Sequence, residues 1–452
     1  MRVHFIAIGG SAMHNLALAL HEKNYEISGS DDEIFEPSRT RLEQKGLLPP
    51  EAGWFPSKIT ADLDAVILGM HARNDNPELL RAKELGIKIY SYPEYLYEQT
   101  KDKCRIVIGG SHGKTSTTAM VMHVLRHVNI KFDYMVGAQL EGFDTMVSLS
   151  DDAKYAVFEG DEYLTSPIDL RPKFHLYRPN IGLITGIAWD HINVFPTFDF
   201  YVKQFQIFAD LIEDDGTLIY FSMDKQLQEI SQNAKKSIRK ICYNTHPFEN
   251  IDGICNLVID KHRIPLQIFG EHNLQNIAGA KAICNTIGIS DSDFYRAIST
   301  FKGAAKRLQL LASNENSNIY LDFAHSPSKL HATTLAVKQQ FPNKKLIACM
   351  ELHTFSSLNK NFLDQYAGTM NVADAAYVYF NPETIKHKNL PEITKEEVAL
   401  GFGGNVNVFT DSNALMQELK RLDYTSSNLL IMTSGNFSGI DLKTFAESII
   451  EM

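Results

Sequence analysis

A glycine-rich loop between a strand and a helix constrains this chain more than any other stretch. The segment Cys104–Ala119 reads CRIVIGGSHGKTSTTA: an apolar β-branched run, a glycine loop, a lysine–threonine pair and a helical start. Such a loop can surround an anion with backbone N–H groups and a helix N-terminus. Ile108 stands where the strict G-x-x-x-x-G-K-[ST] pattern has its first glycine. The sequence therefore predicts a phosphate-binding loop in the shorter G-x-x-G-K-T form.

The loop residues are the expected binding site for a nucleotide's phosphates. Lys114 can reach the terminal phosphates, and the Thr115 hydroxyl can coordinate Mg²⁺. The alternative is a glycine turn that precedes a lysine by chance, but the loop, the lysine, the hydroxyl and the flanking elements all agree. The residues expected to bind the nucleotide here are Gly110, Ser111, His112, Gly113, Lys114, Thr115 and Ser116.

The first hundred residues have the β-α-β pattern of a nucleotide-binding unit. Expected strands at Val3–Ile8 and Tyr25–Ser28 flank an Ala/Leu-rich helix, and Gly9 and Gly10 form the first turn. The full G-x-G-x-x-G fingerprint is absent, which argues against a dehydrogenase. The partial turn better fits a nucleotide diphosphate over a helix N-terminus.

A second polar loop in this region follows the expected buried strand Ala65–Leu68. It carries His71, Arg73 and Asn74 at a strand's carboxyl end, where α/β sheets bind ligands. These side chains could contact a phosphate or a sugar. An ordinary solvated loop is the alternative, and the residues alone leave both open.

Two further expected strands end in polar side chains. Tyr155–Glu159 runs into an acidic turn that ends at Glu162, and Ile181–Ile187 is followed by the run Trp-Asp-His that ends at His191. A carboxylate and an imidazole at neighbouring strand ends can complete a metal shell beside a nucleotide. Glu159 and His191 are therefore candidate ligands; a solvated turn and a structural histidine are the alternatives.

The last third of the chain has a second α/β pattern. An expected strand at Asn318–Leu321 ends in DFAHSP, and strands then alternate with helical segments as far as Met432. This alternation predicts a second doubly wound sheet. Before it, Asn273 stands near an expected helix start, where an amide can cap the helix or bind a base edge.

Composition limits the possible partners and settings. The 452 residues predict two or three domains. The net charge is −10 and no basic block occurs, so a nucleic-acid partner is not expected. No apolar run reaches the roughly 18 residues that span a bilayer. The five scattered cysteines contain no C-x-x-C pair, which fits a reducing cytoplasm.

Seven motifs, taken in order along nearly the whole chain, resemble the Mur ligase family, the ATP-dependent amide ligases of bacterial cell-wall synthesis. They are IGGSAM, GGSHGKTSTT, FEGDEY, WDHINVFP, GEHNLQN, FKGAAKRL and DFAHSP. The resemblance implies a Rossmann-like domain for the UDP sugar (1–102), a central P-loop ATPase domain (103–304) and a C-terminal doubly wound α/β domain (305–452). The last would close on ATP and bind the amine substrate.

The resemblance also implies roles for individual residues. ATP and Mg²⁺ would be the cofactors, with Thr115, Glu159 and His191 on the metal. Asn273 would contact adenine and Asp322 the ribose or phosphate side of ATP. The expected catalytic residues are Lys114, Arg307 and His325. The UDP moiety would be bound by Gly10, Ser11, Ala12, Met13, Ser30, Asp31, His71, Ala72, Arg73 and Asn74.

Within the family, the motifs look more like the murein peptide ligases, which attach a tripeptide to UDP-N-acetylmuramate through an acyl phosphate, than like the ligases that attach L-alanine. Leu321 and Ser326 depart from the family pattern, and residues 351–356 lack an expected arginine. These departures leave open L-alanine as the amine and a catalytically impaired nucleotide-sugar-binding homologue. A monomer or dimer in the cytoplasm is expected.

Overall fold

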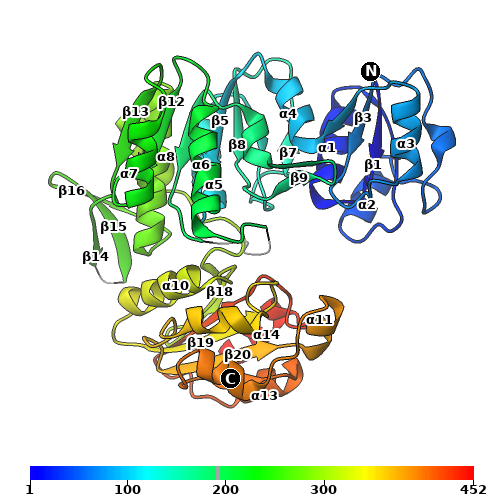
Figure 1. Ribbon diagram of the computed structural model, residues 1–452. Coiled ribbons are helices and arrows are strands. Elements are labelled where there is room, and N and C mark those ends of the chain that lie inside the picture. The colour runs from blue at the N-terminus through cyan, green and yellow to red at the C-terminus, as the bar shows by residue number, and fades with distance from the viewer. Residues whose placement is uncertain (190–193, 252, 452) are drawn as a thin grey trace. The chain divides into compact units, whose positions relative to one another are not determined.

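The computed structural model describes residues 1–189, 194–251 and 253–451 (Figure 1). Within these ranges the chain contains three mainly parallel sheets, of four, seven and six strands, flanked by helices. The predicted α/β class is therefore confirmed. Residue contacts divide the chain into two compact units. The first comprises Met1–Ile187, Phe198–Asn244 and Gly279–Phe294; the second comprises Ala188–Thr197, Thr245–Ala278 and Tyr295–Met452.

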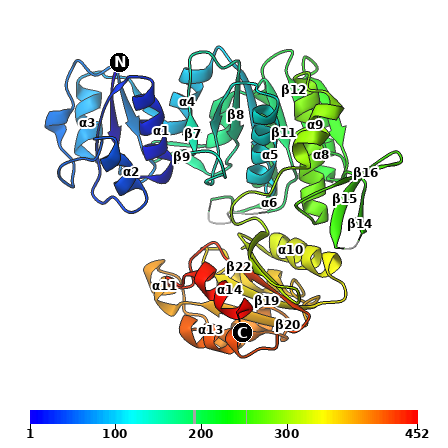
Figure 2. The ribbon, with the colours of Figure 1, turned by 180° about the vertical axis from the view of Figure 1, so that it is seen from behind.

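The first unit begins with a four-stranded parallel sheet of order β2-β1-β3-β4. Its strands are β1 (Arg2–Ile6), β2 (Glu26–Ser30), β3 (Ala65–Leu68) and β4 (Ile89–Ser91). Its helices are α1 (Ser11–Glu22), α2 (Ser38–Gln44), α3 (Pro77–Glu84) and α4 (Tyr92–Thr100). Helices α1 and α3 cover opposite faces in both views (Figures 1 and 2). This is the Rossmann-like arrangement that the sequence predicts.

The central sheet of the first unit has the order β13-β12-β11-β5-β8-β6-β7, parallel except for β7. Its strands are β5 (Cys104–Gly109), β6 (Phe132–Met135), β7 (Val147–Ser148), β8 (Tyr155–Glu159), β11 (Ile181–Ile184), β12 (Thr217–Phe221) and β13 (Arg239–Tyr243). The interior of β5 is fully buried in the middle of this sheet, as its β-branched run requires. Its carboxyl end therefore lies where parallel α/β sheets bind ligands.

Helices and a hairpin surround the central sheet. The helices are α5 (Lys114–His127), α6 (Phe198–Asp210), α7 (Lys225–Asn233), α8 (Glu271–Thr286) and α9 (Asp291–Ile298). The hairpin is β9 (Leu164–Ser166) and β10 (Asp169–Pro172), followed by the 3-10 helix η2 (Lys173–Tyr177). Helix α8 begins in the second unit and ends in the first, so the predicted boundary near residue 304 stays a prediction.

The second unit contains a six-stranded sheet of order β17-β18-β22-β19-β20-β21, parallel except for β17. Its strands are β17 (Gln309–Ser313), β18 (Asn318–Asp322), β19 (Lys345–Leu352), β20 (Ala375–Phe380), β21 (Asn407–Phe409) and β22 (Ser427–Met432). Its helices are α10 (Pro327–Gln340), α11 (Pro382–His387), α12 (Lys395–Gly401), α13 (Ser412–Lys420) and α14 (Leu442–Ile450), with the 3-10 helix η3 (Lys360–Tyr366). Because α10 and α13 lie on opposite faces in both views, this sheet is doubly wound (Figures 1 and 2).

The sequence did not predict the antiparallel strands of the chain. The second unit also holds a three-stranded antiparallel sheet of β14 (Phe248–Ile251), β15 (Ile254–Ile259) and β16 (His262–Pro265). Its outer strands are short, largely exposed and partly charged, so they lack the apolar run that identifies a buried strand. No helix in the described part of the chain has the length and apolar character needed to span a bilayer.

Candidate active site

The predicted phosphate loop joins β5 to the N-terminus of α5. Gly110 has φ +127° and Gly113 has φ +77°, conformations that favour glycine. A Cβ on Gly110 would also lie 2.1 Å from the Thr185 hydroxyl, which donates a hydrogen bond to the His112 carbonyl. The loop therefore depends on both glycines. It begins a helix whose first N–H groups have no partner within the helix, as an anion site requires.

Lys114 lies at the start of α5 and is paired with a carboxylate. Its ammonium donates to the Gly110 carbonyl at 2.7 Å and to Glu162 Oε2 at 2.6 Å. The lysine side chain is 15% exposed and that of Glu162 is 1% exposed. Burial alone would lower the pKa of Lys114, but the nearby carboxylates of Glu162 and Asp161 outweigh it and the pKa is raised. The ammonium therefore stays charged inside the protein.

Thr115 is in contact with the carboxylate predicted as its fellow metal ligand. Its hydroxyl donates to Glu159 Oε1 at 2.8 Å, and the Gly137 amide donates to Glu159 Oε2 at 2.8 Å. Hydroxyl and carboxylate oxygens suit Mg²⁺. His191 lies outside the described residues, which contain no group of three or more His, Cys, Asp or Glu side chains able to bind a metal.

Two residues that the sequence motifs do not assign a role, Glu162 and Tyr201, complete this edge of the sheet. Glu162 follows β8, and Tyr201 lies on α6. The Tyr201 hydroxyl lies 2.9 Å from Ser111 Oγ and donates to Glu162 Oε1 at 3.2 Å. The signal for Glu162 was its place in an acidic run after a buried strand. No local sequence pattern points to Tyr201, because its partners lie far away in sequence.

The four-stranded sheet brings two of the three predicted UDP-binding segments together. The Gly9 amide, next to Gly10 and α1, donates to Asp31 Oδ2 at 2.7 Å, directly after β2. Asp31 is only 6% exposed. Desolvation, with repulsion from Asp32, raises its pKa from 3.8 to about 6.

A cavity of about 490 Å³ adjoins Asp31 and widens this candidate substrate site. Its other lining residues are Ile34, Arg39, Glu43, Gly46, Leu48, Pro49, Pro50, Glu51 and Ala52. The third predicted segment, His71–Asn74, follows β3 and is mostly exposed, with Ala72 buried. There Arg73 pairs with Asp75 at 3.2 Å on the surface.

A loop between β6 and β7 connects the two sheets of the first unit. Its Met146 amide donates to the Asn15 side chain of α1 at 2.9 Å. Arg41 of α2 donates to the Gln139 side chain at 3.0 Å. The same loop contains Gly137, whose amide donates to Glu159. Hydrogen bonds therefore connect the candidate substrate sheet to the candidate metal ligand.

Three of the predicted residues lie together in the second unit. Asp322, at the end of β18, accepts from the Leu308 amide and from the Ala324 amide, each at 2.7 Å. These bonds fix the turn after Arg307 and the turn before His325. The Arg307 guanidinium lies 4.7 Å from the centre of the Phe323 ring.

Asn273 is placed differently from the prediction. The sequence suggests a helix start just after it, whereas α8 begins at Glu271, so Asn273 lies inside the first turn. Its side chain is buried and donates to the Phe269 carbonyl at 2.8 Å. It therefore fixes the entry to the helix within the second unit. Its predicted contact with adenine stays a prediction.

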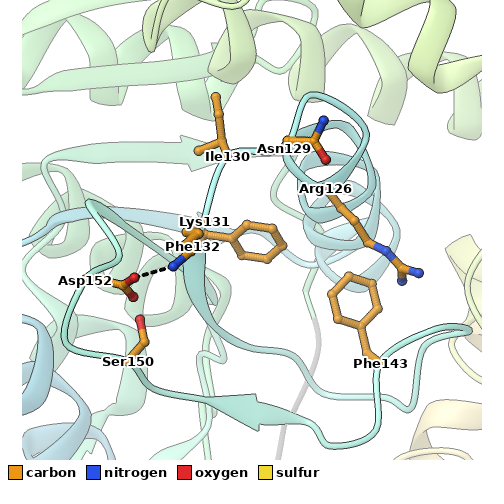
Figure 3. A pocket seen from close by; sticks show the side chains of 8 residues that line it. All are labelled: Arg126, Asn129, Ile130, Lys131, Phe132, Phe143, Ser150 and Asp152. Carbon is orange, nitrogen blue, oxygen red and sulfur yellow. Dashed lines mark hydrogen bonds and ion pairs between the residues drawn. The ribbon is translucent and has the colours of Figure 1, made fainter.

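A further cavity, of about 450 Å³, lies at the C-terminal end of α5, at the other end of the helix from the phosphate loop (Figure 3). Its lining residues are Arg126, Asn129, Ile130, Lys131, Phe132, Phe143, Ser150 and Asp152. Lys131 and Asp152 form an ion pair across it. None of the predicted site residues lines this cavity.

Comparison with known proteins matches three successive parts of the chain to family models. Residues 2–103 match the family described as "Mur ligase family, catalytic domain", residues 108–284 "Mur ligase middle domain" and residues 306–437 "Mur ligase, glutamate ligase domain". The UDP-N-acetylmuramate–L-alanine ligase of Caldicellulosiruptor bescii is 32% identical over 88% of this chain and 87% of that protein. The corresponding ligase of Lactobacillus acidophilus is 30% identical over 91% and 92%.

Solved structures show the same fold at lower identity. The UDP-N-acetylmuramate–alanine ligase of Thermotoga maritima has a TM-score of 0.72 and 20% identity, covering 100% of this chain and 98% of that one. A murein peptide ligase of Psychrobacter arcticus has a TM-score of 0.67 and 21% identity, covering 100% and 99%. The sequence relatives carry the stronger conclusion: the chain belongs to the Mur ligase family, the ATP-dependent C–N bond-forming ligases of peptidoglycan synthesis.

Proposed function

We propose that this chain joins the lactyl carboxylate of UDP-N-acetylmuramate to the amino group of L-alanine, using ATP. The observation that carries the ATP chemistry is the pairing of Lys114 with Glu162 and of Thr115 with Glu159 at one sheet edge. The choice of substrates rests on relatives named for this reaction, which are about 30% identical across most of both chains.

The proposed reaction activates a carboxylate that an amine cannot attack directly. The lactyl carboxylate oxygen attacks the γ-phosphorus of ATP. The bond between the γ-phosphorus and the oxygen that bridges it to the β-phosphate breaks, and ADP leaves. The amine then attacks the acyl carbon of the acyl phosphate, phosphate leaves with the C–O bond electrons, and the amine loses a proton. Because two anions meet in the first step, fixed positive charge near the γ-phosphate lowers its barrier.

Residues of the first unit suit this step. Lys114 would donate to the phosphates and neutralise charge as the phosphoryl group moves. Thr115 and Glu159 would hold Mg²⁺, which would supply further positive charge at the phosphates. Gly10, together with Asp31 in the lining of the cavity after β2, would bind the UDP moiety. Arg307, Asp322 and His325 keep the ATP-directed roles that the family resemblance implies.

A second candidate amine is the tripeptide L-alanyl-γ-D-glutamyl-diaminopimelate. The motifs FEGDEY and DFAHSP favour it, whereas the lack of the expected arginine in residues 351–356 leaves the identity of the amine open. The sequence relatives favour L-alanine, because the two reported above are both named for that amine. L-alanine is therefore the first choice, contrary to the motifs.

A substrate panel tests both choices. Purified protein is given Mg²⁺-ATP and UDP-N-acetylmuramate with L-alanine, with the tripeptide or with no amine, and phosphate release and product mass are measured. A UDP-N-acetylmuramoyl-L-alanine product formed much faster than the tripeptide adduct supports the proposal. Turnover with the tripeptide alone replaces L-alanine but keeps the ligase. No product with either amine, despite ATP binding, indicates the impaired homologue that Leu321 and Ser326 leave open.

A further inference from the structure

The phosphate loop is connected to α6 by a closed ring of hydrogen bonds. Tyr201 donates its single hydroxyl hydrogen to Glu162 Oε1 at 3.2 Å, so Ser111, 2.9 Å away, donates to Tyr201. Glu162 Oε2 accepts from Lys114 at 2.6 Å. Ser111 and Lys114 belong to the same loop, so the ring starts and ends on the phosphate loop.

Two of the three ammonium hydrogens of Lys114 have partners in the protein, which leaves one for a nucleotide. An ammonium group has three hydrogens. The Gly110 carbonyl takes one at 2.7 Å and Glu162 takes another. The third has no partner among the residues that the structure describes. A phosphate oxygen can therefore bind Lys114 without displacing Glu162.

The ring is buried, which makes its parts depend on one another. Tyr201 and Glu162 are both fully buried, and Ser111 is nearly so. A buried carboxylate is unfavourable unless a cation and hydrogen bonds compensate it. Lysine also has a long flexible stem, and holding it in one position costs side-chain entropy. The ion pair with Glu162 can order the Lys114 side chain before the nucleotide binds, provided that Tyr201 holds the carboxylate in place.

From this geometry we propose that Glu162 and Tyr201 are positioning residues, which hold Lys114 and the phosphate loop ready for the triphosphate of ATP. Glu162 fixes the ammonium, and Tyr201 fixes both Glu162 and Ser111. Neither residue needs to touch the substrates. The proposal rests on the proposed function for the measurement of kcat, but not for the measurement of ATP affinity.

Glu162 could have the opposite role, competition with the phosphates for Lys114, and an experiment must distinguish this role from positioning. If Glu162 competes with the phosphates for Lys114, removing its charge would strengthen ATP binding. If it positions Lys114, removing its charge would weaken ATP binding and slow the chemistry. The sign of the change in ATP affinity therefore decides between the two.

The test uses Tyr201→Phe, Glu162→Gln and Glu162→Asp in the full chain. Tyr201→Phe keeps the ring and removes one hydroxyl, so it should fold. We expect Glu162→Gln to lower kcat about 10- to 100-fold and to weaken ATP binding several-fold. Tyr201→Phe should lower kcat about 3- to 10-fold, as expected for one lost hydrogen bond. KM for UDP-N-acetylmuramate should change less than about twofold, and Glu162→Asp should recover part of the loss.

Two matched controls measure what burial alone contributes. Asp133→Asn breaks a second buried ion pair, Lys103–Asp133 at 2.5 Å, in the same sheet. Tyr424→Phe removes a tyrosine hydroxyl that donates to the Leu419 carbonyl at 3.0 Å in the second unit. Both should lower the thermal unfolding temperature and leave ATP affinity and kcat near wild type.

ATP affinity is measured by calorimetric titration and kcat by phosphate release. If wild-type protein binds ATP but makes no product, the proposed function fails while the affinities still test the positioning role. Tighter ATP binding by Glu162→Gln would overturn the proposal in favour of competition. Wild-type affinity and kcat in both Glu162→Gln and Tyr201→Phe would overturn it in favour of a purely structural ring.

Discussion

Acidic side chains lie at the carboxyl ends of strands in both the central sheet and the C-terminal sheet, but they have different partners in the two sheets. At the central edge, Glu162 binds the Lys114 ammonium and Glu159 binds the Thr115 hydroxyl. At the C-terminal edge, Asp322 binds two backbone amides, and Glu351 binds Thr433 and the Phe437 amide. One set of carboxylates contacts groups that can serve a ligand, whereas the other fixes its own turns.

This difference separates two meanings of the same sequence signal. An acid after a buried strand predicts a ligand site in both sheets, because ligands bind at the carboxyl ends of parallel strands. A carboxylate that accepts two buried amides already has a structural role, since those amides need a partner. The comparison predicts that substitutions at the central edge chiefly affect catalysis, whereas those at the C-terminal edge chiefly affect stability.

The largest expected effect distinguishes two largely buried lysines, Lys114 and Lys103, which lie beyond opposite ends of β5. Lys114→Ala should lower kcat about 10³-fold, because it removes fixed positive charge from the phosphates. Lys103→Ala removes the partner of Asp133, at the opposite end of β5, and should leave kcat within a few-fold of wild type. Both changes leave a buried carboxylate without its cation, so thermal unfolding should show similar losses of stability. Equal losses of kcat would contradict a special role for this edge.

Glu159 should control the response to magnesium. Glu159→Gln keeps an oxygen acceptor for the Gly137 amide and removes the negative charge. We expect the Mg²⁺ concentration for half-maximal rate to rise about tenfold, because a neutral amide is a weaker ligand than a carboxylate. Titration of Mg²⁺ at saturating ATP measures this. An unchanged Mg²⁺ dependence would show that Glu159 acts only through Gly137 and Thr115.

Asp322 should matter first for stability. Asp322→Ala leaves the buried Leu308 and Ala324 amides without their acceptor, at a cost of about 1–3 kcal/mol for each. Denaturant unfolding followed by a probe of the second unit measures the loss. Asp322→Asn keeps an acceptor for one amide and should lose less. Weaker ATP binding in Asp322→Asn at unchanged stability would instead support the ATP contact that the family resemblance implies.

The smallest expected effect concerns pH at the candidate UDP site. Burial raises the pKa of Asp31 to about 6, so the folded protein resists its ionisation, and stability falls as pH rises from about 4 to 6. Asp31→Asn should remove that slope and raise the unfolding temperature at pH 7 by a few degrees. Asp32→Asn, which removes only a repelling neighbour, should act more weakly in the same direction. An unchanged slope in Asp31→Asn would contradict this assignment.

Much of the fold could be predicted because its signals are local. The buried run before the phosphate loop, the strand Tyr155–Glu159 and the strand Ala65–Leu68 appear where their apolar, β-branched patterns place them. The ring through Tyr201 could not be predicted, because Ser111 and Tyr201 are 90 residues apart. The ring depends on how α6 packs beside the loop. The apolar pattern of α6 does not indicate which of its residues contacts Glu162.

The loop between β6 and β7 has a consequence for how the first unit unfolds. Its contacts with Asn15 and Arg41 join the first two sheets, and residues of both sheets fall in one compact unit. We expect both sheets to lose structure in a single cooperative transition, because neither can open without breaking contacts that the other shares. A fragment cut near residue 102 would leave the Met146 amide and the Gln139 side chain without these partners. The four-stranded sheet would then be a cooperative part of the same unit as the central sheet and not a separable module.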